Sequence, residues 1–207
     1  MISRIREYSR ENQSWLILAL GFFAAGYLVA STALKNNPQA YQLVMAQLEH
    51  LVELGTTIYT AHPLRGIYLI LLNNTIATFG ILLFSFILGL PPLFSLFGNG
   101  TLMGVVAVLM AEQGISFPVF FFLGILPHGI LELPAFFISA SLGLKIGYHV
   151  IFPLPGETRV SGLKLMVREA VKMAPVIFLL LAVAACVEVL VTPLILAPFV
   201  PGETGLF

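Results

Sequence analysis

The chain has little charge, a single cysteine and no aspartate. Only 10% of its 207 residues are charged, all ten acidic residues are glutamate, and Cys186 is the one cysteine. Soluble domains carry about 25% charged residues, so this composition excludes an ordinary soluble protein. One cysteine excludes an intramolecular disulfide, and its apolar neighbours predict that Cys186 packs as a small hydrophobic side chain. With a formal net charge of +0, no nucleic-acid partner is expected.

Long apolar runs take the place of the missing charge. Hydrophobic residues make up 58% of the chain. Five runs approach the roughly 20 residues that a helix needs to cross a bilayer. We therefore predict an all-α polytopic membrane helix bundle of about five spans, with residues 1–207 forming a single integral membrane domain. The runs cover about 15–34, 66–90, 100–111, 117–146 and 175–197.

Two of these spans are irregular in the sequence. The third begins after Pro91, Pro92 and a Gly-Asn-Gly segment, so it is predicted to be short, about 12 residues or roughly 18 Å of helix. The fourth is too long for one untilted crossing and has Pro127 in its middle. Proline removes a backbone donor and disfavours helix at the preceding residue, so a kink or break is predicted there.

The positions of the basic residues predict the orientation. Eight of the ten fall before the first span or between the fourth and fifth spans, and only Lys35 and Arg65 fall on the other side. Basic loops stay in the cytoplasm, so we predict a multi-pass protein of the cell membrane with its N-terminus inside and its C-terminus outside. The first span exceeds a signal-peptide core in length and is predicted to be retained. The eight residues are Arg4, Arg6, Arg10, Lys145, Arg159, Lys164, Arg168 and Lys172.

Two segments lie between spans. Residues 36–65 predict an extracytoplasmic amphipathic helix that packs on the bundle or on a second subunit. Residues 149–172 predict a cytoplasmic basic loop whose helix, 161–173, lies on anionic lipid. The expected partners are the lipid bilayer, a second copy of the chain, with a dimer favoured, and proteins of the membrane or cell envelope. The small residues Ser139, Gly143 and Gly147 form the stripe that favours self-association.

Six polar residues within the spans form the candidate intramembrane site. His128 and Glu132 are four residues apart, so they share one face of a helix. Ionisable groups at this depth are costly and are retained where they face a protein interior and a partner. The adjacent side-chain amides of Asn73 and Asn74 point about 100° apart on a helix, so one hydrogen-bond partner cannot satisfy both. The six residues are Asn73, Asn74, Asn99, His128, Glu132 and Glu188.

These motifs resemble the stage II sporulation protein M (SpoIIM) family of integral membrane proteins. The resemblance rests on NNT in the second span, GNG before the third, and PHGILE with its trailing small residues in the fourth. It implies an all-α polytopic fold and a role in assembling cell-envelope machinery, as in sporulation. The residues that match are Asn73, Asn74, Asn99, Gly100, Pro127, His128, Gly129 and Glu132.

Three functions remain open from the sequence. The first is a membrane scaffold or assembly factor in which the buried polar groups fix helix packing. The second is a zinc-binding membrane hydrolase, because His128 and Glu132 can both ligate one zinc ion, with Glu188, His62 or His149 as third ligand. The third is a transporter or proton relay that uses Glu132 and Glu188 beside the broken helices. The cofactor, if one is used, is expected to be a divalent metal such as zinc.

Overall fold

The computed structural model describes residues 1–37, 39, 41–42, 44, 62–112, 114 and 116–196. These residues form helices and short connections, and no strand occurs among them, so the predicted all-α fold is confirmed. Five helical segments are long and apolar enough to span a bilayer: α2, α4, α5, the run Phe117–Ile151 and α8. The helices are α1 (Ile2–Glu11), α2 (Gln13–Asn36), α4 (Pro63–Leu83), α5 (Leu90–Glu112), α6 (Phe117–Phe120), the π-helical η1 (Phe121–Ile125), α7 (Leu126–Ile151), α8 (Arg159–Leu190) and α9 (Thr192–Leu196).

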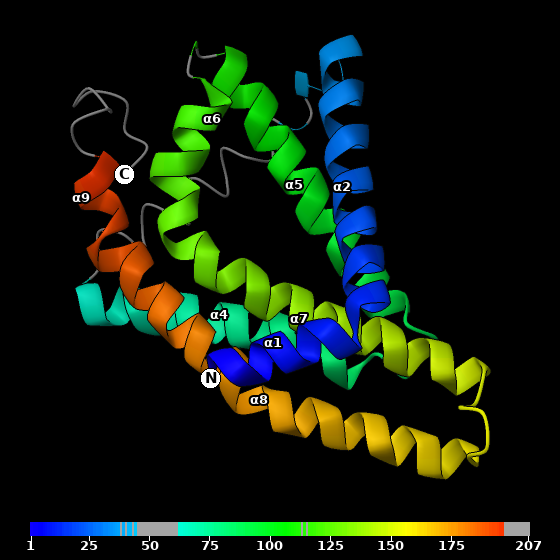
Figure 1. Ribbon diagram of the computed structural model, residues 1–207. Coiled ribbons are helices and arrows are strands. Elements are labelled where there is room, and N and C mark those ends of the chain that lie inside the picture. Colours follow the sequence, from blue (N-terminus) through cyan, green and yellow to red (C-terminus); the bar gives the residue numbers. More distant parts are fainter. Residues whose placement is uncertain are drawn as a thin grey trace.

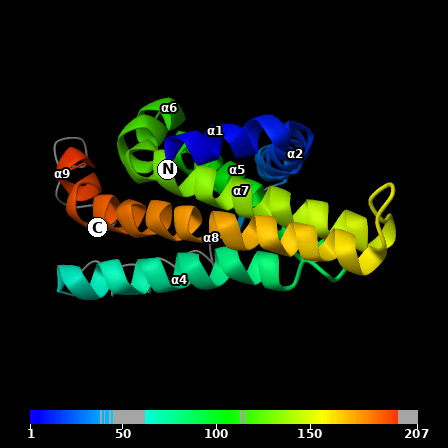
Figure 2. The ribbon, with the colours of Figure 1, turned by 60° about the horizontal axis from the view of Figure 1, so that its bottom comes forward.

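The helices form two groups that meet at an angle. Helices α4, α7 and α8 run side by side, while α2 and α5 pair with each other and rise away from them (Figure 1). A view turned by 60° shows the same three helices stacked, with α8 between α4 and α7 (Figure 2). The antiparallel packing of α7 on α8 brings the start of α7 close to the end of α8. This arrangement positions the candidate site.

The α2–α5 pair is held at backbone contact by glycine. A Cβ on Gly100 would overlap the carbonyl oxygen of Phe23, and one on Gly26 would overlap that of Phe97. Without side chains at these positions the two backbones approach closely, as small residues permit in membrane helices. The buried residues Ala30, Val105 and Val108 continue the contact toward the far end of the pair.

The predicted third span was wrong in length. Helix α5 has 23 residues and includes the Gly-Asn-Gly segment, so it is a full-length span. Pro91 and Pro92 lie in its first turn, where the missing N–H has no partner within the helix, so proline is tolerated. The first bond of the helix runs from the Leu93 amide to the Gly89 carbonyl, at 3.2 Å.

The fourth span changes direction near Pro127, as predicted. The chain passes from α6 through η1 into α7, and Figure 1 shows α6 and α7 pointing in different directions. A proline ring crowds the carbonyl four residues earlier, here that of Leu123. The wider π-helical turn over Phe121–Ile125 accommodates this crowding while the backbone remains helical. Such π-helical turns occur frequently at functional sites.

The connection between the fourth and fifth spans is shorter than the predicted loop 149–172. Helix α7 continues to Ile151 and α8 begins at Arg159, so the separate helix predicted over 161–173 is the first half of α8. The Thr158 hydroxyl caps α8 by accepting a hydrogen bond from the Ser161 amide, at 3.2 Å. Helix-forming Leu, Lys, Arg, Glu and Ala residues carry the helix into the apolar half.

The stripe of small residues is used within the chain. The Ser139 hydroxyl donates to the Thr78 carbonyl, at 2.7 Å, and a Cβ on Gly147 would overlap the backbone of Gly89. Gly143 faces Pro92. The stripe therefore packs α7 against α4, against the turn before α5 and against the first turn of α5, and it no longer argues for self-association. Most of the predicted amphipathic helix 36–65 lies outside the described residues; Tyr41 and Val44 pack on the α2–α5 core.

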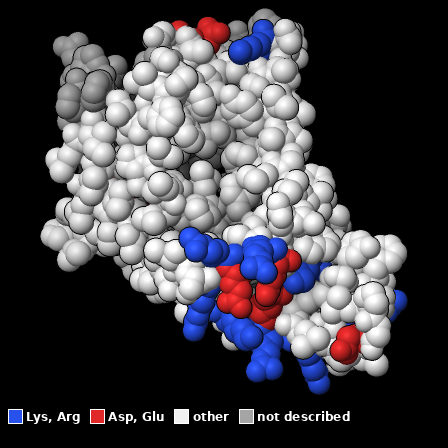
Figure 3. Space-filling model, viewed as in Figure 1, with Lys and Arg blue, Asp and Glu red and all other residues white. Residues whose placement is uncertain are grey.

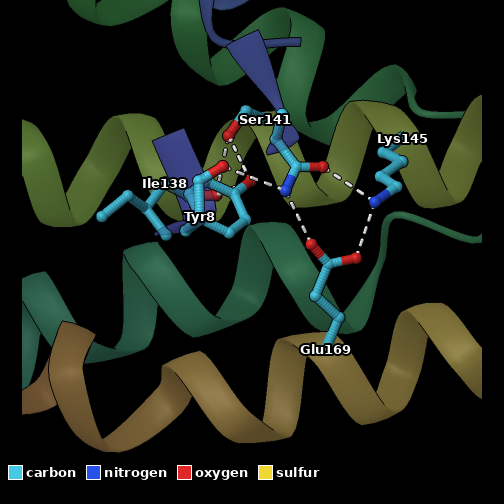
Figure 4. Close-up of polar contacts among 6 residues, drawn as sticks. Tyr8, Ile138, Ser141, Lys145 and Glu169 are labelled. Carbon is cyan, nitrogen blue, oxygen red and sulfur yellow. Dashed lines mark hydrogen bonds and ion pairs between the residues drawn. The ribbon is translucent and has the colours of Figure 1, made fainter. Parts of the chain in front are cut away.

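A second polar cluster fixes α1 to the bundle (Figure 4). Lys145 on α7 forms an ion pair with Glu169 on α8, with 2.6 Å between Nζ and Oε2. Asn12 joins both, because its amide donates to Glu169, at 2.7 Å, and its carbonyl oxygen accepts from Lys145, at 2.8 Å. The Tyr8 hydroxyl lies 2.8 Å from the Ser141 hydroxyl. Before folding, this cluster is visible only as five polar residues from three separate segments of the chain: Tyr8, Asn12, Ser141, Lys145 and Glu169.

Candidate metal centre

Three of the predicted site residues converge. His128 and Glu132 lie in the first two turns of α7, and Glu188 lies in the last turn of α8. One ligand atom from each, an imidazole nitrogen and two carboxylate oxygens, lies within 4.8 Å of the other two. All three side chains are half-buried. The antiparallel packing of α7 on α8 is what brings Glu188 to the i, i+4 pair.

A threonine outside the predicted set orients the imidazole. His128 Nδ1 lies 3.3 Å from the hydroxyl of Thr192, at the start of α9. That hydroxyl also donates to the Val187 carbonyl, at 3.3 Å, and Thr192 is buried. A ligand histidine whose second nitrogen is hydrogen-bonded is held in one orientation. From the sequence, the Thr192-Pro193 pair indicated only the end of the last span.

The predicted amides lie on a cavity next to the three ligands. The cavity has a volume of about 330 Å³, and both His128 and Glu132 line it. Asn99 Nδ2 donates to the Ser95 carbonyl, at 2.9 Å, while Asn73 and Asn74 share one long contact of 3.4 Å. Glu188 does not line the cavity, so it approaches the pair without being part of the wall. The polar lining residues are Asn73, Asn74, Thr78, Ser95, Asn99, His128 and Glu132.

The other histidines named as third ligands lie elsewhere. His62 caps α4, accepting a hydrogen bond from the Leu64 amide at Nδ1, at 3.3 Å. His149 lies near the end of α7, where its Nδ1 is 2.8 Å from the Phe152 carbonyl oxygen. Neither belongs to the converging group, so among the candidates Glu188 is the residue that completes it.

The arrangement suits a divalent cation. Two carboxylates at this separation repel each other, and a cation between them would stabilise both in a low-dielectric setting. Zinc binds imidazole nitrogen and carboxylate oxygen at about 2.0–2.2 Å, which places tetrahedral ligand atoms roughly 3.3 Å apart. The three atoms lie within 4.8 Å of one another, so they would move closer by at most about 1.5 Å to reach that spacing. The transporter hypothesis used two broken helices, the third and fourth spans. It has less support, because the third span, α5, is a continuous helix.

The family resemblance can now be compared with known proteins. The family profile of stage II sporulation protein M matches residues 15–193. The chain belongs to the SpoIIM family. The match runs from the start of α2 to the beginning of α9, so it includes all five spans and the converging group. With its apolar helices, this membership makes the chain a multi-pass membrane protein in a lipid bilayer.

One relative extends the comparison. The SpoIIM-family chain is similar to an uncharacterized protein of Methanocaldococcus jannaschii, with 27% identity over 178 residues. The alignment covers 86% of this chain and 93% of the relative, so the two share most of their length. No solved structure matches the chain significantly.

Proposed function

We propose that this SpoIIM-family protein is a metal-dependent membrane hydrolase. In this proposal His128, Glu132 and Glu188 hold one divalent cation, with zinc as the ion that best fits an imidazole and two carboxylates. The observation that carries it is the convergence of the three ligand atoms within 4.8 Å, from two helices that meet only through the fold. An ionisable side chain at membrane depth costs free energy unless it has a partner. Three such side chains are therefore not expected to meet there by chance.

The cavity gives the proposed site room for a substrate. Catalytic zinc is held by three protein ligands and keeps a further position for water. Such an ion lowers the pKa of its bound water and polarises a carbonyl or phosphoryl oxygen. Asn73, Asn74 and Asn99 line the same cavity and carry amide N–H groups that can hydrogen-bond a substrate. The asparagines of the cavity wall would thus orient the substrate, and Thr192 holds the His128 imidazole in place.

Metal content is the test of this proposal. Protein purified in detergent with zinc supplied should hold about one zinc ion per chain. The variants His128→Ala and Glu132→Ala should each lower the affinity for zinc by about 10-fold or more. His149→Ala is the matched control, because His149 is a histidine on the same helix outside the group. Wild-type protein without stoichiometric metal would contradict the proposal, as would equal losses in His128→Ala and His149→Ala.

The orientation with the N-terminus inside is part of the proposal. Lys and Arg side chains gather with the glutamates around α1 and the adjoining parts of α7 and α8, and another basic residue lies at the opposite end of the molecule (Figure 3). This distribution supports a cytoplasmic α1 under the positive-inside rule. Labelling of single-cysteine variants at either end, in a Cys186→Ser background, would test it from the two sides of the membrane.

A scaffold or assembly factor is the second candidate. The observation that favours it is the dense charged surface around α1, which a protein partner in the membrane or envelope could recognise (Figure 3). The scaffold candidate includes the homodimer that was predicted from the sequence. The test is the mass of the complex in mild detergent together with pull-down of partners: a monomer with no retained partner, unchanged by Glu132→Gln, would exclude this candidate.

A further inference from the structure

The polar wall of the cavity lies at the depth of the hydrocarbon. Asn73 is the middle residue of α4, roughly 15 Å of helix from either end. Asn99 lies well inside α5, which also spans the bilayer by length and composition. An amide that finds no hydrogen bond in hydrocarbon costs several kcal/mol. The shared contact of Asn73 and Asn74 is long, at 3.4 Å, so these amides are available to hydrogen-bond a polar occupant of the cavity.

The mouth of the cavity opens sideways. Asn73 and Ala77 on α4 and Asn99 and Leu102 on α5 line the cavity and are also exposed on the surface of their helices. Helix α4 packs mainly on α7 and α8, and α5 packs mainly on α2, so the mouth lies between α4 and α5. The surface of a spanning helix at this depth faces lipid tails. A molecule that enters here comes from the bilayer.

The remaining lining is apolar. The wall is completed by Phe23, Met103, Val106, Ile125, Gly129, Leu133 and Phe136. A volume of about 330 Å³ lies at the lower end of the roughly 300–1,000 Å³ range of small-ligand sites, which suits a lipid headgroup rather than a whole lipid. An amphiphile can satisfy both kinds of surface at once, with its polar group on the amides and its chains against the apolar rim.

We infer that the cavity receives the polar headgroup of a membrane lipid, which enters between α4 and α5. The amides of Asn73, Asn74 and Asn99 hydrogen-bond the headgroup, and His128 and Glu132 lie beside it. The inference names the substrate class of the proposed hydrolase site and rests on that proposal. A water-soluble ligand is disfavoured because the exposed lining residues lie on lipid-facing helix surfaces.

A photoreactive headgroup tests this directly. The protein is placed in vesicles of phosphatidylethanolamine and phosphatidylglycerol that contain a trace of phosphatidylethanolamine with a diazirine on its headgroup amine. Headgroups of surrounding lipids stay at the interface, so labelling deep in a span reports entry into the cavity. Labelling is mapped at Leu102 and Met103 of α5 and at Leu179, which is exposed in the apolar half of α8.

The expected result is labelling at Leu102 and Met103 about tenfold above that at Leu179, the equivalent of about 1.4 kcal/mol. The double variant Asn73→Leu/Asn99→Leu should lower it to the level of Leu179. Phe94→Leu is the control, because Phe94 is an exposed apolar residue of the same helix that does not line the cavity. Should the double variant fail to fold, Asn99→Leu alone changes an exposed side chain at the mouth and should lower labelling severalfold.

Equal labelling at α5 and α8, or labelling that the asparagine variants leave unchanged, would overturn the inference. Zinc content is measured on the same samples. Zinc without headgroup labelling would overturn the lipid inference and leave the metal site standing, while labelling without zinc would contradict the proposed hydrolase and support the lipid cavity alone.

Discussion

Asn12 and Glu169 form a 2.7 Å hydrogen bond across 157 positions of the chain. The contact joins the start of α2 to the first half of α8, and Lys145 of α7 binds both partners. Asn12 is almost completely buried, while Lys145 and Glu169 retain 20% and 25% side-chain exposure. Three helices thus share one charged cluster at the end of the molecule away from the candidate metal site, and it can be altered without touching that site.

Removing Glu169 should destabilise the protein. Glu169→Ala leaves the Lys145 ammonium with one protein partner and the Asn12 amide with one, which is expected to cost about 1–3 kcal/mol. The melting temperature in detergent measures the loss. Glu157→Ala is the control, since Glu157 is exposed in the connection between α7 and α8. Equal melting temperatures for the two variants would show that the cluster contributes nothing to stability.

Tyr8 should make stability fall in alkali. Burial raises the pKa of the Tyr8 hydroxyl above its ordinary value of 10.0. Above that value the unfolded chain releases the proton and the folded protein retains it, so stability decreases as pH rises, by about 1.4 kcal/mol per unit at most. Tyr8→Phe lacks this group. Its melting temperature should be lower than wild type near neutral pH, because the bond to Ser141 is lost.

The two melting temperatures should therefore approach each other from about pH 9 to about pH 11. The comparison isolates Tyr8, because the lysines and other tyrosines titrate in both proteins. Curves that stay parallel over this range would contradict a buried neutral Tyr8.

Gly100 should not tolerate a methyl group. In Gly100→Ala the new Cβ would overlap the Phe23 carbonyl oxygen, so α2 and α5 must separate, at a cost of about 1–3 kcal/mol. Gly98 lies two residues earlier in the same helix with nothing within 4 Å of its Cβ position. Gly98→Ala should be neutral or stabilise by about 0.5–1 kcal/mol through helix propensity. Thermal unfolding of the pair measures the difference, and equal unfolding would mean that the helices do not meet at Gly100.

The spans could be predicted because each depends on local composition. Apolar runs located all five, and Pro127 located the change of direction in the fourth. The length of α5 was wrong because Pro91 and Pro92 disrupt a helix interior but fit a first turn, and sequence alone did not say where the helix began. The predicted span therefore began at Gly100, although α5 begins ten residues earlier, at Leu90, and Gly100 serves a helix contact inside it.

The site could be predicted only in part, for a geometric reason. His128 and Glu132 share a helix face through their spacing, which is a local property. The approach of Glu188, and its advantage over His62 and His149, depends on α7 packing antiparallel to α8. Thr192 and the Tyr8–Ser141 contact depend on tertiary packing as well.

The most direct measurement of the central claim is X-ray absorption at the zinc edge of the metal-loaded protein in detergent. The proposal predicts a first shell of nitrogen and oxygen at about 2.0–2.2 Å, with an imidazole contribution that His128→Ala removes. Glu188→Gln should change the shell, and Glu112→Gln, which alters an exposed glutamate at the end of α5, should not. A sulfur shell near about 2.3 Å, or a spectrum that Glu188→Gln leaves unchanged, would contradict the proposed site.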